Sequence, residues 1–182
     1  MTENEESNKR DEVIFRQPQP VDGMAIYKIV DASKPLDLNS LYSYLLICSH
    51  HDNTSVVVEH KGAITGYISG YIHPKKDDTL FIWQVAVDKS MRKMGLARKM
   101  ILDILSRPGL DNIQFIETTV TPSNTASRGF FRNLASKLET ECIETEYFTG
   151  EMFGGEDHEP EDLFRIGPFS SNTVRIKYKE EQ

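Results

Sequence analysis

The chain is poor in cysteine and tryptophan, and it has no long hydrophobic run. Its 182 residues include two cysteines, Cys48 and Cys142, and one tryptophan, Trp83. Two cysteines far apart give neither a disulfide framework nor the paired spacing of a metal site, so we expect reduced thiols, with Cys48 buried, and no metal. No apolar stretch is long enough to cross a bilayer, and residues 1–11 are polar rather than signal-like, which predicts a cytoplasmic protein without a membrane partner.

Positive charge is also in deficit. The chain has 21 Lys and Arg against 28 Asp and Glu, a formal net charge of −7. This balance disfavours nucleic acid or an anionic membrane as the main partner, and it weakly favours a cationic substrate. The length and the 38% hydrophobic content suit one globular domain. We expect a flexible tail over residues 1–12, a single domain over residues 13–169, and a C-terminal tail or extra strand over residues 170–182.

The most informative stretch runs from Thr79 to Arg107. It begins with a nearly continuous apolar run, typical of a strand buried on both faces. It ends in a segment with apolar residues at helical spacing. Residues 92–97 therefore join a strand to the start of a helix, where backbone N–H groups have no intrahelical partner and the helix dipole is positive. Gly95 and Ala97 leave the backbone approachable, so this loop can bind a phosphate or diphosphate.

The other hydrophobic patterns predict further strands and helices. Strands are expected at residues 13–15, 24–30, 54–60, 63–72, 113–120, 142–148 and 163–166. Helices are expected at residues 37–48, capped by Asp37 or Asn39, and at 125–137, capped by Ser123 or Asn124. Residues 151–161 form an acidic loop, and alternation at Val174, Ile176 and Tyr178 indicates a strand in the tail. This order favours a mixed sheet covered on both faces over a doubly wound dinucleotide-binding fold.

The element order and two motifs resemble the GNAT-type acetyltransferases, which use acetyl-CoA. The motifs are Arg-x-x-Gly-x-Ala at residues 92–97 and Pro-Ser-Asn-x-x-Ser at residues 122–127, and the resemblance covers about residues 24–166. Stretches 35–46, 80–87, 118–127 and 156–161 are similar to one group in that family, the L-2,4-diaminobutyrate acetyltransferases of ectoine biosynthesis. The resemblance implies an α/β (α+β) GNAT fold, with a mixed, mostly antiparallel sheet splayed at the acetyl-CoA site, and a homodimer.

The resemblance also implies the cofactor-binding residues. The backbone N–H of Val85, at a bulge of the central strand, would donate to the developing oxyanion, and Val85 and Val87 would hold the pantetheine arm. Asn124 would reach the pantetheine from the other side. The diphosphate would be held by the loop and its neighbours, namely Arg92, Lys93, Met94, Gly95, Leu96, Ala97 and Arg98. Lys93 and Arg98 could equally be solvated. Phe131, expected beside the cofactor, stands where many relatives have a tyrosine that protonates the leaving thiolate, so the general acid is unassigned.

Acetyl transfer to an amine also requires a base, because an amine with a pKa near ~10 arrives as ammonium. Many relatives place a carboxylate on the central strand for this step, but here Phe81 and Trp83 fill that stretch. Asp37 and Glu161 are the candidates, acting directly or through water, or binding the substrate's ammonium groups. The alternatives are that Asp37 only caps a helix and that Glu161 belongs to an ordinary surface loop.

Four more residues are candidates for binding the substrate. Trp83 could hold an ammonium group by cation–π attraction, although a lone tryptophan more often packs in a core. Tyr42 and Tyr44 are two apart on a helix and face different ways, so we expect only Tyr42 to reach the site. Thr119 ends its strand and is a weaker candidate. His158 lies in the acidic loop and could equally be an ordinary surface residue.

The resemblance thus implies transfer of an acetyl group from acetyl-CoA to the 4-amino group of L-2,4-diaminobutyrate, by direct attack in a ternary complex. The product would be N4-acetyl-L-2,4-diaminobutyrate, for osmotic-stress protection through ectoine. One alternative is a GNAT acetyltransferase that acts on another diamine, a polyamine or a protein N-terminus. Another is a GNAT-fold module that binds acyl-CoA without catalysis, because the strand carboxylate and the tyrosine at position 131 are both missing.

Overall fold

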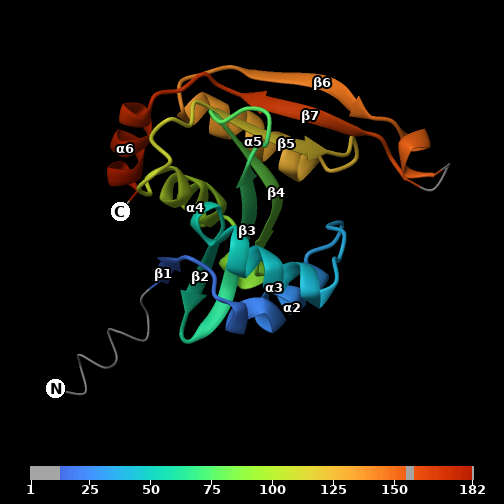
Figure 1. Ribbon diagram of the computed structural model, residues 1–182, viewed down its shortest axis with the longest axis vertical. Coiled ribbons are helices and arrows are strands. Elements are labelled where there is room, and N and C mark those ends of the chain that lie inside the picture. The colour runs from blue at the N-terminus through green and yellow to red at the C-terminus, as the bar shows by residue number, and fades with distance from the viewer. Residues whose placement is uncertain (1–12, 155–157, 182) are drawn as a thin grey trace. The chain divides into compact units, whose positions relative to one another are not determined.

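The computed structural model describes residues 13–154 and 158–181 (Figure 1). The expected tail over residues 1–12 and the middle of the acidic loop lie outside the described residues. The strands form one mixed sheet in the order β1-β2-β3-β4-β5-β7-β6. The β1–β2, β2–β3, β5–β7 and β6–β7 pairs are antiparallel and the β4–β5 pair is parallel, which confirms the predicted mixed, mostly antiparallel sheet.

The chain divides into two compact units. The first contains the chain up to Tyr71 together with Gln84–Ile104, and the second contains Ile72–Trp83 and the chain from Leu105 onward. Strand β4 (Thr79–Val87) therefore contributes its first half to the second unit and its second half to the first. The splay of the sheet implied by the resemblance concerns the junction of the two units and stays a prediction.

The strands of the first unit follow the predicted pattern. Strand β1 (Val13–Arg16) pairs with β2 (Val56–His60), and β2 pairs with β3 (Ala63–Ile72), both antiparallel. Lys61 and Gly62, between β2 and β3, have φ of 54° and 76°. Two consecutive left-handed residues are typical of a tight hairpin turn, so the predicted hairpin is confirmed. The amide of Asp88 donates to the carbonyl of Thr65 (2.9 Å), which joins the end of β4 to β3.

The predicted strand at residues 24–30 is wrong, because this segment is the helix α2 (Gly23–Asp31). Its buried residues, Ile26, Ile29 and Val30, are spaced by three and four, which matches a helix rather than a strand. Helix α3 runs over Leu41–His50, not from Asp37. Neither Asp37 nor Asn39 is its cap. Ser40 is, and its hydroxyl accepts from the amide of Ser43 (3.2 Å).

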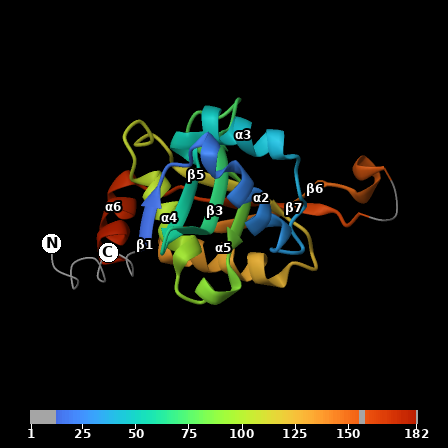
Figure 2. The ribbon, with the colours of Figure 1, turned by 90° about the horizontal axis from the view of Figure 1, so that it is seen from below.

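Helices cover both faces of the sheet in the first unit. Residues of α2 and α3 pack with Val57, Tyr67 and Ala86 in one buried cluster. On the other face, a Cβ built at Gly66 would lie 3.3 Å from Met100 of α4 (Leu96–Leu105). Figure 2 shows these helices around β3. Cys48 is in the cluster as predicted, and burial raises the pKa of its thiol to about 11.

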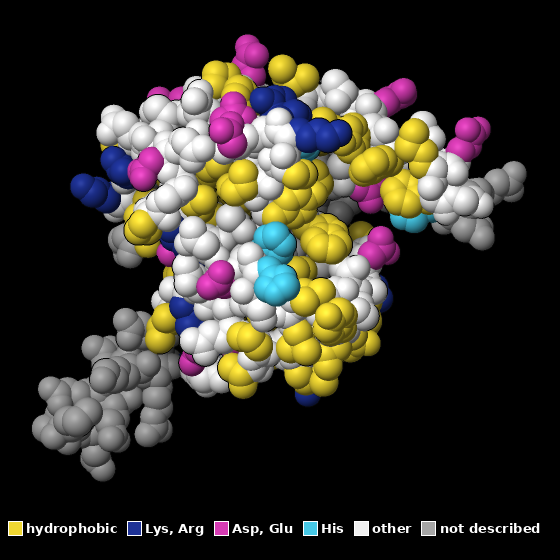
Figure 3. Space-filling model, in the orientation of Figure 1, with side chains coloured by type: hydrophobic (Ala, Val, Ile, Leu, Met, Phe, Trp, Pro, Cys, Tyr) yellow, Lys and Arg dark blue, Asp and Glu magenta, His cyan; other side chains and the backbone are white. Residues whose placement is uncertain are grey.

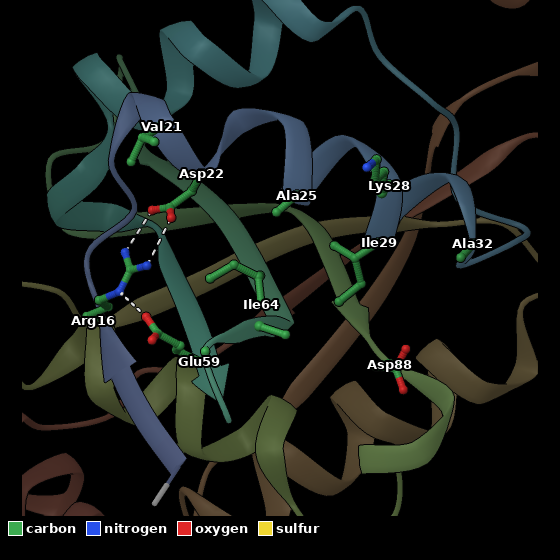
Figure 4. A pocket seen from close by; sticks show the side chains of 12 residues that line it. Arg16, Val21, Asp22, Ala25, Lys28, Ile29, Ala32, Glu59, Ile64 and Asp88 are labelled. Carbon is green, nitrogen blue, oxygen red and sulfur yellow. Dashed lines mark hydrogen bonds and ion pairs between the residues drawn. The ribbon is translucent and has the colours of Figure 1, made fainter. Parts of the chain in front are cut away.

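An ion network ties β1 to the segment before α2. Arg16 donates two hydrogen bonds to the carboxylate of Asp22 (2.7 and 2.9 Å) and one to Glu59 on β2 (3.1 Å). These residues line a cavity of about 460 Å³ with an apolar floor that includes Ile29 and Ile64 (Figure 4). The Arg16 guanidinium lowers the pKa of the Asp22 carboxyl. No predicted site residue lines this cavity, so we assign it no part in the site.

In the second unit, β5 (Phe115–Val120) pairs with β7 (Glu161–Ile166), and β7 pairs with β6 (Cys142–Phe148). Strands β6 and β7 form a long arm in both ribbon views (Figures 1 and 2). Helix α5 (Thr125–Lys137) has the predicted bounds. The predicted strand in the tail is wrong: residues 171–180 form α6 (Ser171–Glu180), which buries Val174 and has Ser170 as its cap. The single-domain boundaries 13–169 stay a prediction.

Candidate active site

The loop before α4 has the backbone shape of an anion site. Lys93 and Gly95 have φ of 65° and 74°, so two left-handed residues flank Met94. Helix α4 then begins, with the amide of Lys99 donating to the carbonyl of Gly95 (3.0 Å). The amides of Leu96 and Ala97 belong to the first turn, where backbone N–H groups have no acceptor within the helix and point out of its end. This arrangement fits a diphosphate.

Cationic side chains lie on the same loop. Arg92 and Lys93 are exposed, and Arg98 is half-buried. The Nε of Arg92 donates to the carbonyl of Val87 (2.9 Å), which attaches this side chain to the end of β4. The charges of Arg92 and Lys93 and the positive end of the helix dipole would all attract an anion. The loop therefore has the backbone shape and the charge that its predicted role requires, and the role itself stays a prediction.

Strand β4 is buried on one face only, so the prediction of a strand buried on both faces is wrong. Leu80, Ile82, Gln84 and Ala86 are buried, whereas Phe81, Trp83, Val85 and Val87 are partly or fully exposed. Trp83 is 48% exposed. A tryptophan that only packed a core would be largely buried, so this ring has a face open to a ligand. The predicted roles of Val85 and Val87 require backbone groups beside this open face and remain predictions.

Gln84 holds the segment that contains Asp37. It is buried on β4, and its side-chain amide donates to the backbone carbonyl of Asp37 (2.7 Å). Its other side-chain atom, Oε1, is buried without a hydrogen-bond partner in the described residues. Asp37 itself is exposed and lies before α3 rather than in it. The helix-cap alternative for Asp37 is therefore wrong, while its role as base or ammonium ligand stays a prediction.

The two tyrosines of α3 differ in exposure, as their spacing predicted. Tyr42 is 69% exposed. Tyr44 is fully buried, its hydroxyl accepts from the amide of Asn39 (3.2 Å), and its ring makes edge contacts with Tyr27 and Tyr67. Tyr44 is thus a core residue, and Tyr42 is the one of the pair that a ligand can reach.

In the second unit, strand register places three predicted substrate residues on one face of the sheet. Phe81 is paired with Glu117, Thr119 with Leu163, and Phe148 with Glu161. Paired residues share a face, and side chains alternate along each strand. Trp83, two residues after Phe81, therefore lies on the same face as Thr119, two after Glu117. Glu161, two residues before Leu163, lies there too, so strand alternation places Trp83, Thr119 and Glu161 on the same face.

The opposite face of this sheet is covered by α5. The Phe131 ring packs against Phe130 and Phe164, at centroid distances of 5.0 and 6.4 Å, and Phe131 is 3% exposed. Arg128 of the same helix binds Asp162 (2.7 Å) and Glu144 (2.8 Å). Phe131 is thus a core residue of the second unit, and its predicted contact with the cofactor finds no support in this packing.

The beginning of α5 and the acidic loop are joined by hydrogen bonds. Asn124 is the N-cap of α5, and its Oδ1 accepts from the amide of Ser127 (3.1 Å). Glu159 accepts from the amide and the hydroxyl of Ser123 (3.0 and 2.5 Å). The His158 ring stacks on Phe153 at 3.8 Å. His158 and Glu161 are therefore not in an unstructured loop: Glu161 begins β7, and His158 precedes it in an anchored segment.

A charged network lies further along the same face as Trp83. Glu117 is 2% exposed and accepts from Lys76 (2.7 Å) and from Arg165, whose guanidinium also lies over the Phe115 ring at 3.8 Å. Burial raises the pKa of Glu117, but the hydrogen bonds from Lys76 and Arg165 outweigh it, so the pKa is lowered. Glu117 therefore stays ionised at neutral pH, and its lowered pKa and two ion pairs make it a poor proton acceptor.

The described residues contain neither a candidate metal site nor a candidate membrane span. Across residues 13–154 and 158–181, no group of three or more His, Cys, Asp or Glu side chains is placed to hold a metal ion. Nor does any helix in those ranges combine the length and apolar character needed to span a membrane.

Comparison with known proteins identifies the fold family. The family model described as "Acetyltransferase (GNAT) family" matches residues 24–135, more than half of the chain. The chain belongs to the GNAT family.

Proteins similar to this GNAT chain include enzymes of one activity. It is 48% identical over 151 residues to the L-2,4-diaminobutyric acid acetyltransferase of Virgibacillus pantothenticus, covering 83% of this chain and 95% of that protein. It is 42% identical to the enzyme of the same name from Halomonas elongata, covering 89% and 84%. The structure of diaminobutyrate acetyltransferase EctA from Paenibacillus lautus, with L-2,4-diaminobutyric acid and coenzyme A, matches with a TM-score of 0.83 and 40% identity, covering 87% of this chain and 96% of that one.

Two residues of this GNAT site were missed by sequence reasoning. Gln84 has a weak signal, since it is a polar residue inside an otherwise apolar strand. Glu159 has none, because one carboxylate among several in an acidic loop is indistinguishable from its neighbours. Only the fold shows that Gln84 holds the Asp37 segment and that Glu159 binds the turn before α5.

Proposed function

We propose that the chain transfers the acetyl group of acetyl-CoA to the 4-amino group of L-2,4-diaminobutyrate, giving N4-acetyl-L-2,4-diaminobutyrate for ectoine synthesis. The observation on which this rests is the shared face of Trp83, Thr119 and Glu161. That face presents an exposed aromatic ring, a hydroxyl and a carboxylate, in a chain 41–48% identical to several diaminobutyrate acetyltransferases.

The chemistry of this face suits a small diamine. A carboxylate at Glu161 attracts an ammonium group, and the open face of Trp83 attracts the same charge by cation–π interaction, worth ~0.5–2 kcal/mol. Thr119 adds a hydroxyl that can accept from N–H. Asp37 supplies a second carboxylate in the first unit, where Gln84 holds its backbone.

The reaction is a direct acyl transfer. The neutral N4 attacks the thioester carbonyl carbon, the C–N bond forms, and the Val85 N–H stabilises the oxyanion. The C–S bond then breaks, and CoA leaves as a thiolate, which needs little proton assistance because a thiol pKa is near ~8.5. The proton lost from N4 passes to Asp37 or Glu161, directly or through water. No tyrosine is required at Phe131 for this sequence of steps.

The cofactor would lie with its diphosphate on residues 92–98. Amides of the first turn of α4, together with the left-handed residues Lys93 and Gly95, would bind its oxygens. Arg92 and Lys93 would add positive charge. Asn124 at the start of α5 would reach the pantetheine.

We also propose that the chain is a cytoplasmic homodimer whose product serves in osmotic stress. Hydrophobic side chains are exposed on β6 and on η4 (Gly150–Phe153): Ile143, Tyr147, Phe148, Met152 and Phe153. Figure 3 shows hydrophobic side chains on the projecting arm, beside a histidine. We expect a second copy to cover them. Tyr147→Glu should lower the mass measured by light scattering to that of one chain, and an unchanged mass would place the dimer surface elsewhere.

The activity is tested by incubating the chain with acetyl-CoA and L-2,4-diaminobutyrate. Free CoA should appear at the rate of amine loss, and NMR should place the acetyl group on N4. Lysine, ornithine, spermidine and a peptide amine serve as controls and should turn over far more slowly. Absence of turnover with diaminobutyrate contradicts the proposal. Tight acetyl-CoA binding without transfer to any amine would support a binding module instead.

A further inference from the structure

Glu159 makes a contact that its position in an acidic, exposed loop does not explain. Its two carboxylate oxygens accept from Ser123, one from the amide (3.0 Å) and one from the hydroxyl (2.5 Å). The residues are 36 positions apart, so the contact spans two segments of the second unit. Hydrogen bonds from Ser123 lower the pKa of the Glu159 carboxyl, so it is charged at neutral pH.

The Ser123 end of this contact belongs to the cofactor side of the site. Ser123 directly precedes Asn124, the N-cap of a helix of 13 residues. A carboxylate held there also interacts favourably with the positive end of the α5 dipole. Asn124 follows Ser123 directly in the chain, and its Oδ1 accepts from the amide of Ser127 (3.1 Å), so the contact with Glu159 lies next to the cap of α5.

The Glu159 end belongs to the amine side of the site. The backbone carbonyl of Glu159 lies 2.6 Å from Nδ1 of His158, and the His158 ring stacks on Phe153 at 3.8 Å with an interplanar angle of 19°. Two residues after Glu159, Glu161 begins β7 opposite Phe148. The carboxylate therefore fixes a segment with a predicted substrate residue on each side of it.

We propose that Glu159 is a positioning residue: it fastens the segment of His158 and Glu161 to the start of α5, so that recognition of the amine is coupled to the cofactor-binding end of that helix. This inference rests on the proposed function, because it takes His158 and Glu161 as amine-binding and Asn124 as cofactor-binding. Glu159 touches no reacting atom in this scheme. Its effect passes through the two segments it joins.

The test compares Glu159→Ala, Glu159→Gln and Ser123→Ala with the control Glu151→Ala. Glu151 is an exposed carboxylate in η4 of the same loop. Glu159→Ala should raise the KM for diaminobutyrate roughly tenfold while kcat falls less than about threefold, since the amine is misplaced rather than the chemistry lost. The Kd for acetyl-CoA alone should stay within about twofold, and Tm within about 2 °C, because both segments stay folded.

Glu159→Gln should restore most of the affinity, because its amide can accept from the Ser123 N–H and donate to the Ser123 hydroxyl. Ser123→Ala should fall between wild type and Glu159→Ala, and adding it to Glu159→Ala should change nothing more, since the two residues share one interaction. Glu151→Ala should match wild type. A readout without turnover is hydrogen exchange, in which the Ser123 amide should exchange roughly tenfold faster in Glu159→Ala.

Unchanged KM and unchanged Ser123 exchange in Glu159→Ala overturn the inference. An equal rise of KM in Glu151→Ala also overturns it, because the effect would then be one of loop charge. Wild-type protein that fails to acetylate diaminobutyrate contradicts the proposed function instead. The two failures are therefore distinguishable, since only the second appears in the unsubstituted chain.

Discussion

Replacing Gly95 should weaken CoA binding, because the diphosphate loop depends on a backbone conformation that L residues disfavour. Gly95 has φ of +74°, and a Cβ added there would lie 3.4 Å from Nη2 of Arg98, one of the cations expected near the diphosphate. An L residue in the left-handed region costs roughly 1–2 kcal/mol. A loop that relaxed to relieve this strain would turn its amides away from the ligand. We therefore expect the Kd for CoA to rise about fivefold to thirtyfold, with valine above alanine.

The matched control is Gly109→Ala. Gly109 has φ of +85° with no atom within 4 Å of a built Cβ, and it follows α4 rather than preceding it. It should lose similar conformational stability in urea unfolding and keep full affinity for CoA in calorimetry. Equal CoA affinity in Gly95→Ala, Gly95→Val and wild type would refute the diphosphate assignment. Equal losses in Gly95→Ala and Gly109→Ala would show that the effect is global.

Three further predictions concern the amine site and the first unit. Trp83→Ala should raise the KM for diaminobutyrate roughly tenfold, and Trp83→Phe should raise it less because the phenyl ring keeps part of the cation–π attraction. Steady-state kinetics measure these KM values, and a KM equal to that of wild type in both variants would exclude the cation–π contact. Glu161→Gln should cut kcat/KM at least tenfold with little change in Tm, whereas normal rates would exclude β7 from the site. Asp22→Asn should cost about 2 kcal/mol in urea unfolding at pH 7, since Asp22 is 7% exposed and bound by Arg16. Because the pKa of Asp22 is lowered by Arg16, the wild type's advantage is full above about pH 4 and is lost as the pH falls through the folded-state pKa. An advantage that does not shrink as the pH falls below about 4 would contradict this.

Local sequence patterns were enough to predict several helices, strands and turns correctly. Residues 125–137 form the predicted helix, and the Lys61-Gly62 turn joins the predicted strands, because helix periodicity over several turns and a left-handed dipeptide are both local signals. The loop at residues 92–97 could be placed before a helix for the same reason, while its binding of a diphosphate stays a prediction. Residues 24–30 were wrongly predicted as a strand, because the hydrophobic pattern of seven residues fits both a short strand and two turns of helix.

The sequence by itself determined the fold family, the place of the loop before α4, and most of the residues proposed for the site. Only the tertiary structure decided that Trp83, Thr119 and Glu161 share a face, that Tyr44 and Phe131 are core residues, and that Gln84 and Glu159 hold the segments around the site. Strand register, burial and contacts between distant segments depend on which parts of the chain pack together. A single sequence specifies that packing only through its global minimum of free energy, not through any local pattern.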